Sequence, residues 1–314
     1  NKAPVCSPFC TVAMPPPEEK RRKSILEKTQ LSNAILLREF MSEFLGTFVL
    51  VMIGDGTVAG IVLNLSSGGE AMLLAACGYS AGYILATLVS GGVSGGHINP
   101  AVTLAYCITG QVSWKQLPIY WLAQYSGAFL GSAIVYGIHY EAIVTYEAID
   151  RNKIDTAVIL TTFPKPSVGY PTAYFDQVLG SMIMMICFEA IADRRNMKIP
   201  RRIAPVMIGL TMFCIFLGVG FNCGTGCNPA RDLAPRLFGL IFYNADMLMN
   251  PRGLVYWWIP FVAPHVGTVL GGLIYLAFIM YHHVREEDLI YQRYLESTRT
   301  SLSDEETAKR KVKA

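Results

Sequence analysis

The motif Asn-Pro-Ala occurs twice in this chain, each time in an apolar neighbourhood. Asn is a preferred N-cap of a helix, and Pro suits the first helical position because its missing N–H loses no hydrogen bond there. Each copy therefore predicts a short helix that begins inside an apolar segment. Its tip carries an amide and the positive end of the helix dipole, which can hold the oxygen of a neutral molecule and disfavour a cation. The six residues are Asn99, Pro100, Ala101, Asn228, Pro229 and Ala230.

Two other patterns suggest different chemistry. Ser94 lies in a G-x-S-G pattern, as in an intramembrane serine protease, but a serine nucleophile needs a His base. His139 and His265 both fall at predicted membrane ends, and a protease would leave the second Asn-Pro-Ala unexplained. The segment CGTGC at 223–227 has no His or second Cys pair near it, so we predict neither a metal nor a cofactor.

The segments that must position these motifs are long and apolar. Hydrophobic residues make up 52% of the 314 residues and charged residues only 16%, whereas soluble domains are about a quarter charged. A bilayer span needs about 20 apolar residues. Six segments fit, at approximately 40–63, 71–91, 117–138, 177–192, 203–221 and 255–281. The apolar stretches at roughly 100–109 and 229–243 are too short to cross and are predicted to be re-entrant.

The placement of charge predicts the orientation. If both termini are cytoplasmic, most of the 26 Lys and Arg residues fall on the inner side of six spans, as the positive-inside rule requires. The basic cluster at 20–23 lies at a membrane edge, where anionic lipid is the expected partner. We therefore expect membrane lipid as a partner and no nucleic acid.

The two halves of the chain resemble each other. EFLGT at 43–47 corresponds to QVLGS at 177–181, and LAQYSGAFLG at 122–131 to VAPHVGTVLG at 262–271, whose Gly-x-x-x-Gly pairs are expected to pack helices. Each half holds three spans, an odd number, so the second half must be inverted relative to the first. The predicted organisation is a cytoplasmic, mostly disordered tail at 1–37, a channel domain at 38–283 (repeat one 38–139, outer loop 140–175, repeat two 176–283) and a cytoplasmic tail at 284–314.

Inversion brings the two short helices in from opposite sides. Their N-terminal tips are predicted to meet near the bilayer centre, with Asn99 and Asn228 facing each other across a narrow passage. Two positive dipole ends disfavour a cation, and two amides can orient a passing oxygen so that it relays no protons. The pattern therefore favours a pore for neutral solutes.

The motifs SGGHINPAVT and GFNCGTGCNPARDLAPRLF resemble those of the aquaporin (major intrinsic protein) family, over roughly residues 38–282 and with the aquaglyceroporin branch most similar. The resemblance implies an all-α membrane protein of six transmembrane helices and two re-entrant half-helices. It also implies a homotetramer located in the plasma membrane. It implies a passive channel, not an enzyme, for water and small neutral polyols such as glycerol, which excludes ions and protons.

The same resemblance assigns Arg231 to a selectivity filter, as a cation repeller and hydrogen-bond donor. Aligned without gaps, Tyr79, Thr225 and Phe216 fall at the other filter positions. Phe216 either fills volume lost at Thr225, which would favour water over solutes, or turns into the core. The residues typical of the glycerol-conducting branch are Tyr136, Asp232, Arg236 and Pro264.

Other polar residues have weaker assignments. The resemblance implies that Glu43 holds backbone carbonyls of a re-entrant loop, with Gln177 as its repeat partner. Asp55 is placed in an outer vestibule, without a role. His97 either makes a satisfied hydrogen bond or acts as a pH-sensitive gate, and Asn64 begins a glycosylation sequon. A coupled transporter would need an ionisable relay, for which the spans offer only Glu43, Asp55 and Glu189.

Overall fold

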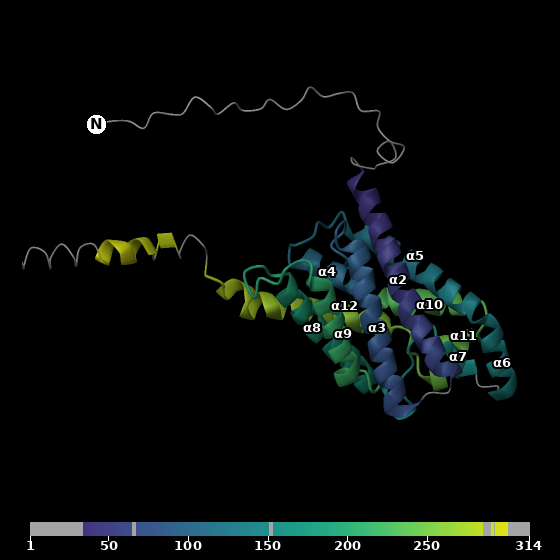
Figure 1. The fold of residues 1–314 in the computed structure, drawn as a ribbon. Helices are drawn as coiled ribbons and strands as arrows, with labels where there is room; N and C mark the ends of the chain where they lie inside the picture. The colour runs from purple at the N-terminus through teal and green to yellow at the C-terminus, as the bar shows by residue number, and fades with distance from the viewer. Residues whose placement is uncertain (1–33, 65–66, 151–152, 285–289, 292, 301–314) are drawn as a thin grey trace, which may run out of the picture. The chain divides into compact units, whose positions relative to one another are not determined.

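The computed structural model describes residues 34–64, 67–150, 153–284, 290–291 and 293–300. Among these residues every regular element is a helix, and none is a strand (Figure 1). The helices are α2 (Ile35–Leu63), α3 (Gly68–Ser90), α4 (Pro100–Ile108), α5 (Leu117–Ile138), α6 (Tyr140–Asp150), α7 (Lys153–Ala157), α8 (Tyr170–Ala192), α9 (Ala204–Val219), α10 (Pro229–Gly239), α11 (Ala245–Met249) and α12 (Ile259–Phe278), with 3-10 turns η1 (Pro251–Gly253) and η2 (Met280–His282).

The six predicted apolar segments each contain one helix. Four of them, α2, α3, α8 and α12 with η2, are long and apolar enough to cross a membrane. Helix α5 meets that requirement together with α6, from which it is bent by 66°, and α9 is a shorter apolar helix of 16 residues. The prediction of an all-helical membrane architecture is confirmed.

The two Asn-Pro-Ala motifs each begin a short helix. Helix α4 has 9 residues and α10 has 11, so at about 1.5 Å per residue neither spans the roughly 30 Å hydrocarbon layer. Helix α4 packs against α12, and α10 packs against α5. Thr268 of α12 donates a hydrogen bond to the carbonyl of Ala101 at 2.9 Å. Each half-helix is therefore held by the last long helix of the other half of the chain.

The repeat is visible in how the long helices approach each other. A Cβ atom on Gly127 would collide with the backbone carbonyl of Phe44, and one on Gly267 with that of Val178. Phe44 and Val178 are themselves equivalent in the alignment of EFLGT with QVLGS. Glycine at these positions lets the backbone of α5 approach that of α2, and the backbone of α12 approach that of α8, more closely than a side chain would allow.

The segment 140–175, which the sequence predicts as an outer loop, is partly helical. It contains α6 and α7. Ile143 and Leu160 are buried in one apolar cluster with Phe238 and Leu248, which lie at and after the end of α10. These apolar residues are isolated among polar ones, so the sequence has no long periodic pattern there, and tertiary burial orders the segment.

The predicted tails lie mostly outside the described residues. Residues 1–33 are not described, and α2 already begins at Ile35, within the predicted tail. In the predicted C-terminal tail the described residues 293–300 are helical.

Candidate functional site

Asn99 and Asn228 cap the two half-helices. Asn99 has extended backbone, and its Oδ1 accepts a hydrogen bond from the N–H of Ala101 at 2.9 Å. Asn228 does the same with the N–H of Ala230 at 3.1 Å. Pro100 and Pro229 occupy the first helical positions. Both helices therefore begin where the sequence predicts, for the predicted reason.

The same two amides join the halves. Nδ2 of Asn99 donates to the carbonyl of Cys227 at 2.9 Å, and Nδ2 of Asn228 donates to the carbonyl of Ile98 at 2.7 Å. Each asparagine thus bonds the residue that precedes the other asparagine. An amide nitrogen carries two N–H groups, and the Asn228 side chain also interacts with the hydroxyl of Tyr83. The two helix N-termini lie side by side, and the arrangement is reciprocal.

The loop before α4 is strained and firmly anchored. Ile98 has a φ of 46°, a left-handed conformation that is costly for a β-branched residue. Glu43 accepts hydrogen bonds from the backbone N–H groups of His97 and Ile98 at 2.9 and 2.6 Å. Ser94 Oγ and Gln124 Nε2 donate to the same carboxylate at 2.5 and 2.8 Å. Four donors satisfy a buried charge and hold the Ile98 carbonyl toward Asn228.

This arrangement corrects the predicted role of Glu43. It holds backbone N–H groups and not carbonyls, because an ionised carboxylate can only accept hydrogen bonds. The equivalent residue, Gln177, does hold a carbonyl: its Nε2 donates to Gly224 at 3.1 Å. Gln177 also donates to Asp176 at 3.2 Å. The exchange of an acid for an amide thus changes which backbone group each anchor can hold.

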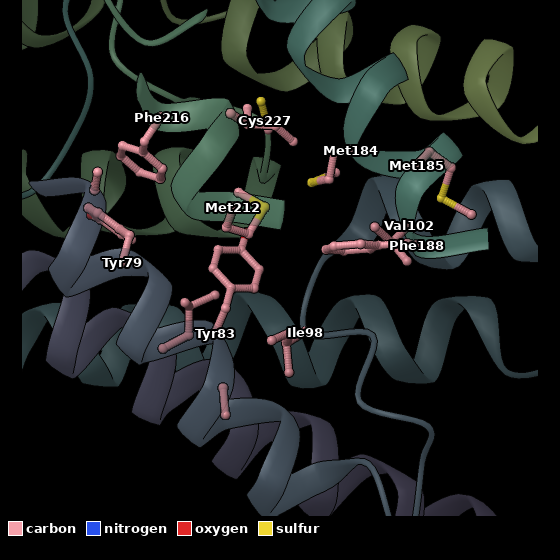
Figure 2. Close-up of a cluster of buried hydrophobic side chains, with 14 of the residues drawn as sticks. Tyr79, Tyr83, Ile98, Val102, Met184, Met185, Phe188, Met212, Phe216 and Cys227 are labelled. Carbon is pink, nitrogen blue, oxygen red and sulfur yellow. The ribbon is translucent and has the colours of Figure 1, made fainter. Parts of the chain in front are cut away.

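Three of the four predicted filter residues lie together with Asp55. The rings of Tyr79 and Phe216 stack with centroids 5.0 Å apart (Figure 2). The guanidinium carbon of Arg231 lies 4.8 Å from the centroid of the Tyr79 ring. The Tyr79 hydroxyl donates to Oδ1 of Asp55 at 2.5 Å. We call Asp55, Tyr79, Phe216 and Arg231 the Tyr79 cluster.

Phe216 combines the two alternatives that the sequence leaves open. Its ring stacks on a filter candidate, and it also belongs to the buried apolar core with Tyr83 and Met212 (Figure 2). Thr225 is buried as well, and within the described part of the chain its hydroxyl has no hydrogen-bond partner.

Asp232 and Arg236 form a buried ion pair beside Arg231. Nη2 of Arg236 lies 2.8 Å from Oδ1 of Asp232. Thr162, from the segment 140–175, donates its backbone N–H and its hydroxyl to Oδ2 of Asp232 at 2.9 and 2.5 Å. Arg236 also donates to the backbone carbonyls of Thr162 and Leu248. The pair therefore ties α10 to the segment between α5 and α8.

The other residues typical of the glycerol-conducting branch lie apart from the Tyr79 cluster. Tyr136 stacks on Phe242 with centroids 4.1 Å apart, in an aromatic group at the end of α10. Pro264 is buried inside α12, and Nδ1 of the following His265 hydrogen-bonds the carbonyl of Phe261 at 2.7 Å. The Tyr136 contact joins α5 to the turn after α10, whereas the His265 hydrogen bond lies within α12.

His97 lies on the wall of a cavity of about 640 Å³. Its Nδ1 hydrogen-bonds the hydroxyl of Thr103 at 3.1 Å, and its ring contacts Tyr106 and Tyr120. The side chains that line this cavity also include Arg194, Arg201 and Arg202. Asn64 directly follows α2, and its Nδ2 donates a hydrogen bond to the carbonyl of Gly60 in the last turn of that helix at 2.7 Å.

Sequence reasoning missed Gln124 and Thr162 and gave Asp55 no role. Gln124 had a usable signal, since a buried amide in an apolar span must find a partner. Thr162 had none, because it lies in a segment without a recognisable pattern.

The sequence profile of the family described as Major intrinsic protein matches residues 30–275. The chain belongs to the major intrinsic protein family. This family consists of membrane channels, so the chain is an integral membrane protein and the serine-protease interpretation of Ser94 is wrong. The Ser94 hydroxyl instead donates a hydrogen bond to Glu43.

Similar members of the major intrinsic protein family include two human proteins. Aquaporin-9 of Homo sapiens is 41% identical over 283 residues, covering 89% of this chain and 94% of that protein. Aquaporin-10 of Homo sapiens is 37% identical over 254 residues, covering 80% and 83%. The X-ray structure of the aquaglyceroporin from Plasmodium falciparum matches with a TM-score of 0.70 and 30% identity, over 78% of this chain and 97% of that one. The predicted resemblance to aquaglyceroporins is confirmed.

Proposed function

We propose that this protein is a passive channel for water and small neutral polyols such as glycerol, and that it excludes ions and protons. The observation that carries the proposal is the reciprocal pair of hydrogen bonds from Asn99 to the Cys227 carbonyl and from Asn228 to the Ile98 carbonyl. The similar proteins named aquaporin and aquaglyceroporin support the same solute class.

The exclusion of charge has a physical basis at this point. Two helix N-termini lie together, and each contributes roughly half a positive charge. A cation that approaches them loses hydration and meets repulsion, whereas a neutral molecule does not meet that repulsion. Arg231, which is only 5% exposed, is the proposed filter residue that repels cations and donates hydrogen bonds to solutes.

Stopped-flow light scattering of proteoliposomes tests the proposal. Vesicles with the purified protein should shrink and reswell faster than empty vesicles in glycerol, with a low activation energy, and should show no added proton or potassium flux. Urea extends the solute series. Rates equal to those of empty vesicles for both water and glycerol would refute the channel proposal.

A second candidate is a channel dominated by water, with a restricted solute range because of Phe216 and Thr225. The stacking of Phe216 on Tyr79 favours it. Phe216→Ala removes the stacked ring, so glycerol permeability should rise relative to water permeability. Phe213→Ala is the matched control, since Phe213 lies on the same helix and packs at the edge of the core. Equal effects of the two substitutions would assign Phe216 to the core alone.

A coupled transporter is the remote alternative. Glu43, one candidate for its relay, is bonded by four donors and serves the loop. Glu189 accepts from Gln111 Nε2 at 2.7 Å. Glycerol uptake that saturates or follows an imposed proton gradient would support this alternative against a pore.

The assembly and location belong to the same proposal. We expect a homotetramer with one pore per protomer, embedded in plasma-membrane lipid with both termini in the cytoplasm. Native mass spectrometry from detergent measures the number of subunits, and protease protection of tagged termini in sealed cells measures the orientation.

A further inference from the structure

Asp55 is a fully buried acid in the middle of α2, with no role in the proposed mechanism so far. Its side chain has no exposed surface. Oδ1 accepts the hydroxyl of Tyr79 at 2.5 Å and lies 3.9 Å from Nη2 of Arg231. Burying a carboxylate is costly unless it is paired and hydrogen-bonded. Its partners are two residues of the Tyr79 cluster.

The preceding glycine shows that α2 is shaped to receive Tyr79. A Cβ atom on Gly54 would overlap the Tyr79 ring, so only glycine allows the ring to lie this close to the helix. Gly54 thus admits the ring and Asp55 takes its hydroxyl. One face of the ring is stacked on Phe216, and Arg231 also lies near it. The position of Tyr79 therefore depends on α2, α9 and α10 together.

Asp55 is also the principal counter-charge of Arg231. The described residues place two carboxylates near the guanidinium, Asp55 and Asp232, each at 3.9 Å. Asp232 is already engaged by Arg236 at 2.8 Å and by Thr162. Asp55 has no other cation within ion-pair distance among the described residues. With Asp55 ionised, two arginines and two aspartates balance, and the net charge of this region is zero.

We propose that Asp55 is a positioning residue for the filter: by fixing the Tyr79 hydroxyl and offsetting the charge of Arg231, it sets the aperture and the charge that solutes meet. This inference rests on the proposed channel function and deepens it. Asp55 does not touch the solute, because it has no exposed surface. It acts through Arg231 and Tyr79, which do have some. A polyol fills the aperture more closely than water does, so glycerol permeation should depend on this arrangement more strongly.

A double-mutant cycle on the full chain in proteoliposomes tests the proposal. The readout is the ratio of glycerol to water permeability for the wild type, Asp55→Asn, Arg231→Gln and the double variant. Asp55→Asn keeps the side-chain shape and removes the charge. We expect it to lower the ratio by about threefold or more with Arg231 present and to have little effect with Arg231→Gln, since residues that act through one contact are not additive.

Asp176→Asn is the matched control. Asp176 is another buried aspartate, in α8, and it accepts hydrogen bonds from Gln177 and Asn222. Its effect should be the same with and without Arg231. Should Asp55→Asn fail to fold, Tyr79→Phe removes the hydrogen bond from Tyr79 to Asp55 while keeping the ring and both charges, and it should lower the ratio in the same direction.

The contrary outcomes are distinct. A change of the ratio by Asp55→Asn that is equal in both Arg231 backgrounds would make Asp55 a purely structural residue and overturn the inference, as would an unchanged ratio in the Asp55→Asn or Tyr79→Phe variant. A wild-type protein that passes neither water nor glycerol would instead refute the proposed function itself.

Discussion

In the first half of the chain a carboxylate anchors the re-entrant loop, whereas in the second half an amide and a neighbouring ion pair share that task. Glu43 receives four hydrogen bonds, two of them from the loop backbone. Gln177 makes one hydrogen bond to its loop, and within the described part of the chain its Oε1 has no partner. Asp232 and Arg236 stabilise the second loop region from the other side.

The hydrogen bonds of the two capping asparagines nevertheless have similar lengths in the two halves. The two cross-bonds measure 2.9 and 2.7 Å, and the two cap bonds 2.9 and 3.1 Å. The geometry at the centre is therefore set by the asparagines and the helix starts, which are equivalent in the repeat. The supports could diverge because any group that satisfies the loop backbone serves equally well. The following substitutions test this division.

The largest effect is expected for Arg236→Met. It leaves Asp232 as a buried charge without its closest partner, and breaking such a pair costs about 3–5 kcal/mol. Unfolding by sodium dodecyl sulfate in mixed micelles measures the loss. Arg195→Met is the control, because Arg195 is mostly exposed and its partner Asp193 also contacts Tyr275 and His283, so its loss should be smaller than that at Arg236. Equal losses would mean that the second half does not depend on its ion pair.

Glu43→Gln should have the next largest effect. The amide has one acceptor oxygen where four donors converge, so about two buried donors lose partners, at about 1–3 kcal/mol each. Water permeability should fall with stability, because the Ile98 carbonyl is no longer held. Gln177→Met, at the equivalent position, loses one hydrogen bond to the loop and should cost about 1 kcal/mol. A loss at Gln177 as large as that at Glu43 would contradict the difference between the anchors.

Asn99→Ala and Asn228→Ala should have smaller effects on stability than Glu43→Gln, and nearly equal ones. Each removes one helix cap and one cross-bond, together about 1–2 kcal/mol. Asn244→Ala is the control for the loss of a cap alone. Asn244 caps α11 on the surface and makes no cross-bond between the halves, so its replacement should cost about 0.5–1 kcal/mol. Clearly unequal losses for Asn99 and Asn228 would show that the supports, and not the caps, set the central geometry.

Several features could be predicted because their causes are local. The start of each half-helix follows from the cap chemistry of Asn and Pro, and the spans follow from apolar length. The equivalence of Glu43 and Gln177 follows from the alignment of the two repeats. The helices inside 140–175 could not be predicted, because the burial of Ile143 and Leu160 depends on residues near the end of α10.

The sequence by itself determined that the chain crosses a membrane, that it repeats, and that two asparagine-capped helices begin inside the apolar region. The tertiary structure decided which groups meet there: the Cys227 carbonyl with Asn99, 128 positions away, Thr162 with Asp232, 70 positions away, and Asp55 with Tyr79 and Arg231. Helix caps and apolar length act over a few neighbouring residues. The partner of a buried polar group is chosen among all the segments that folding brings together, and that choice depends on the packing of the whole chain.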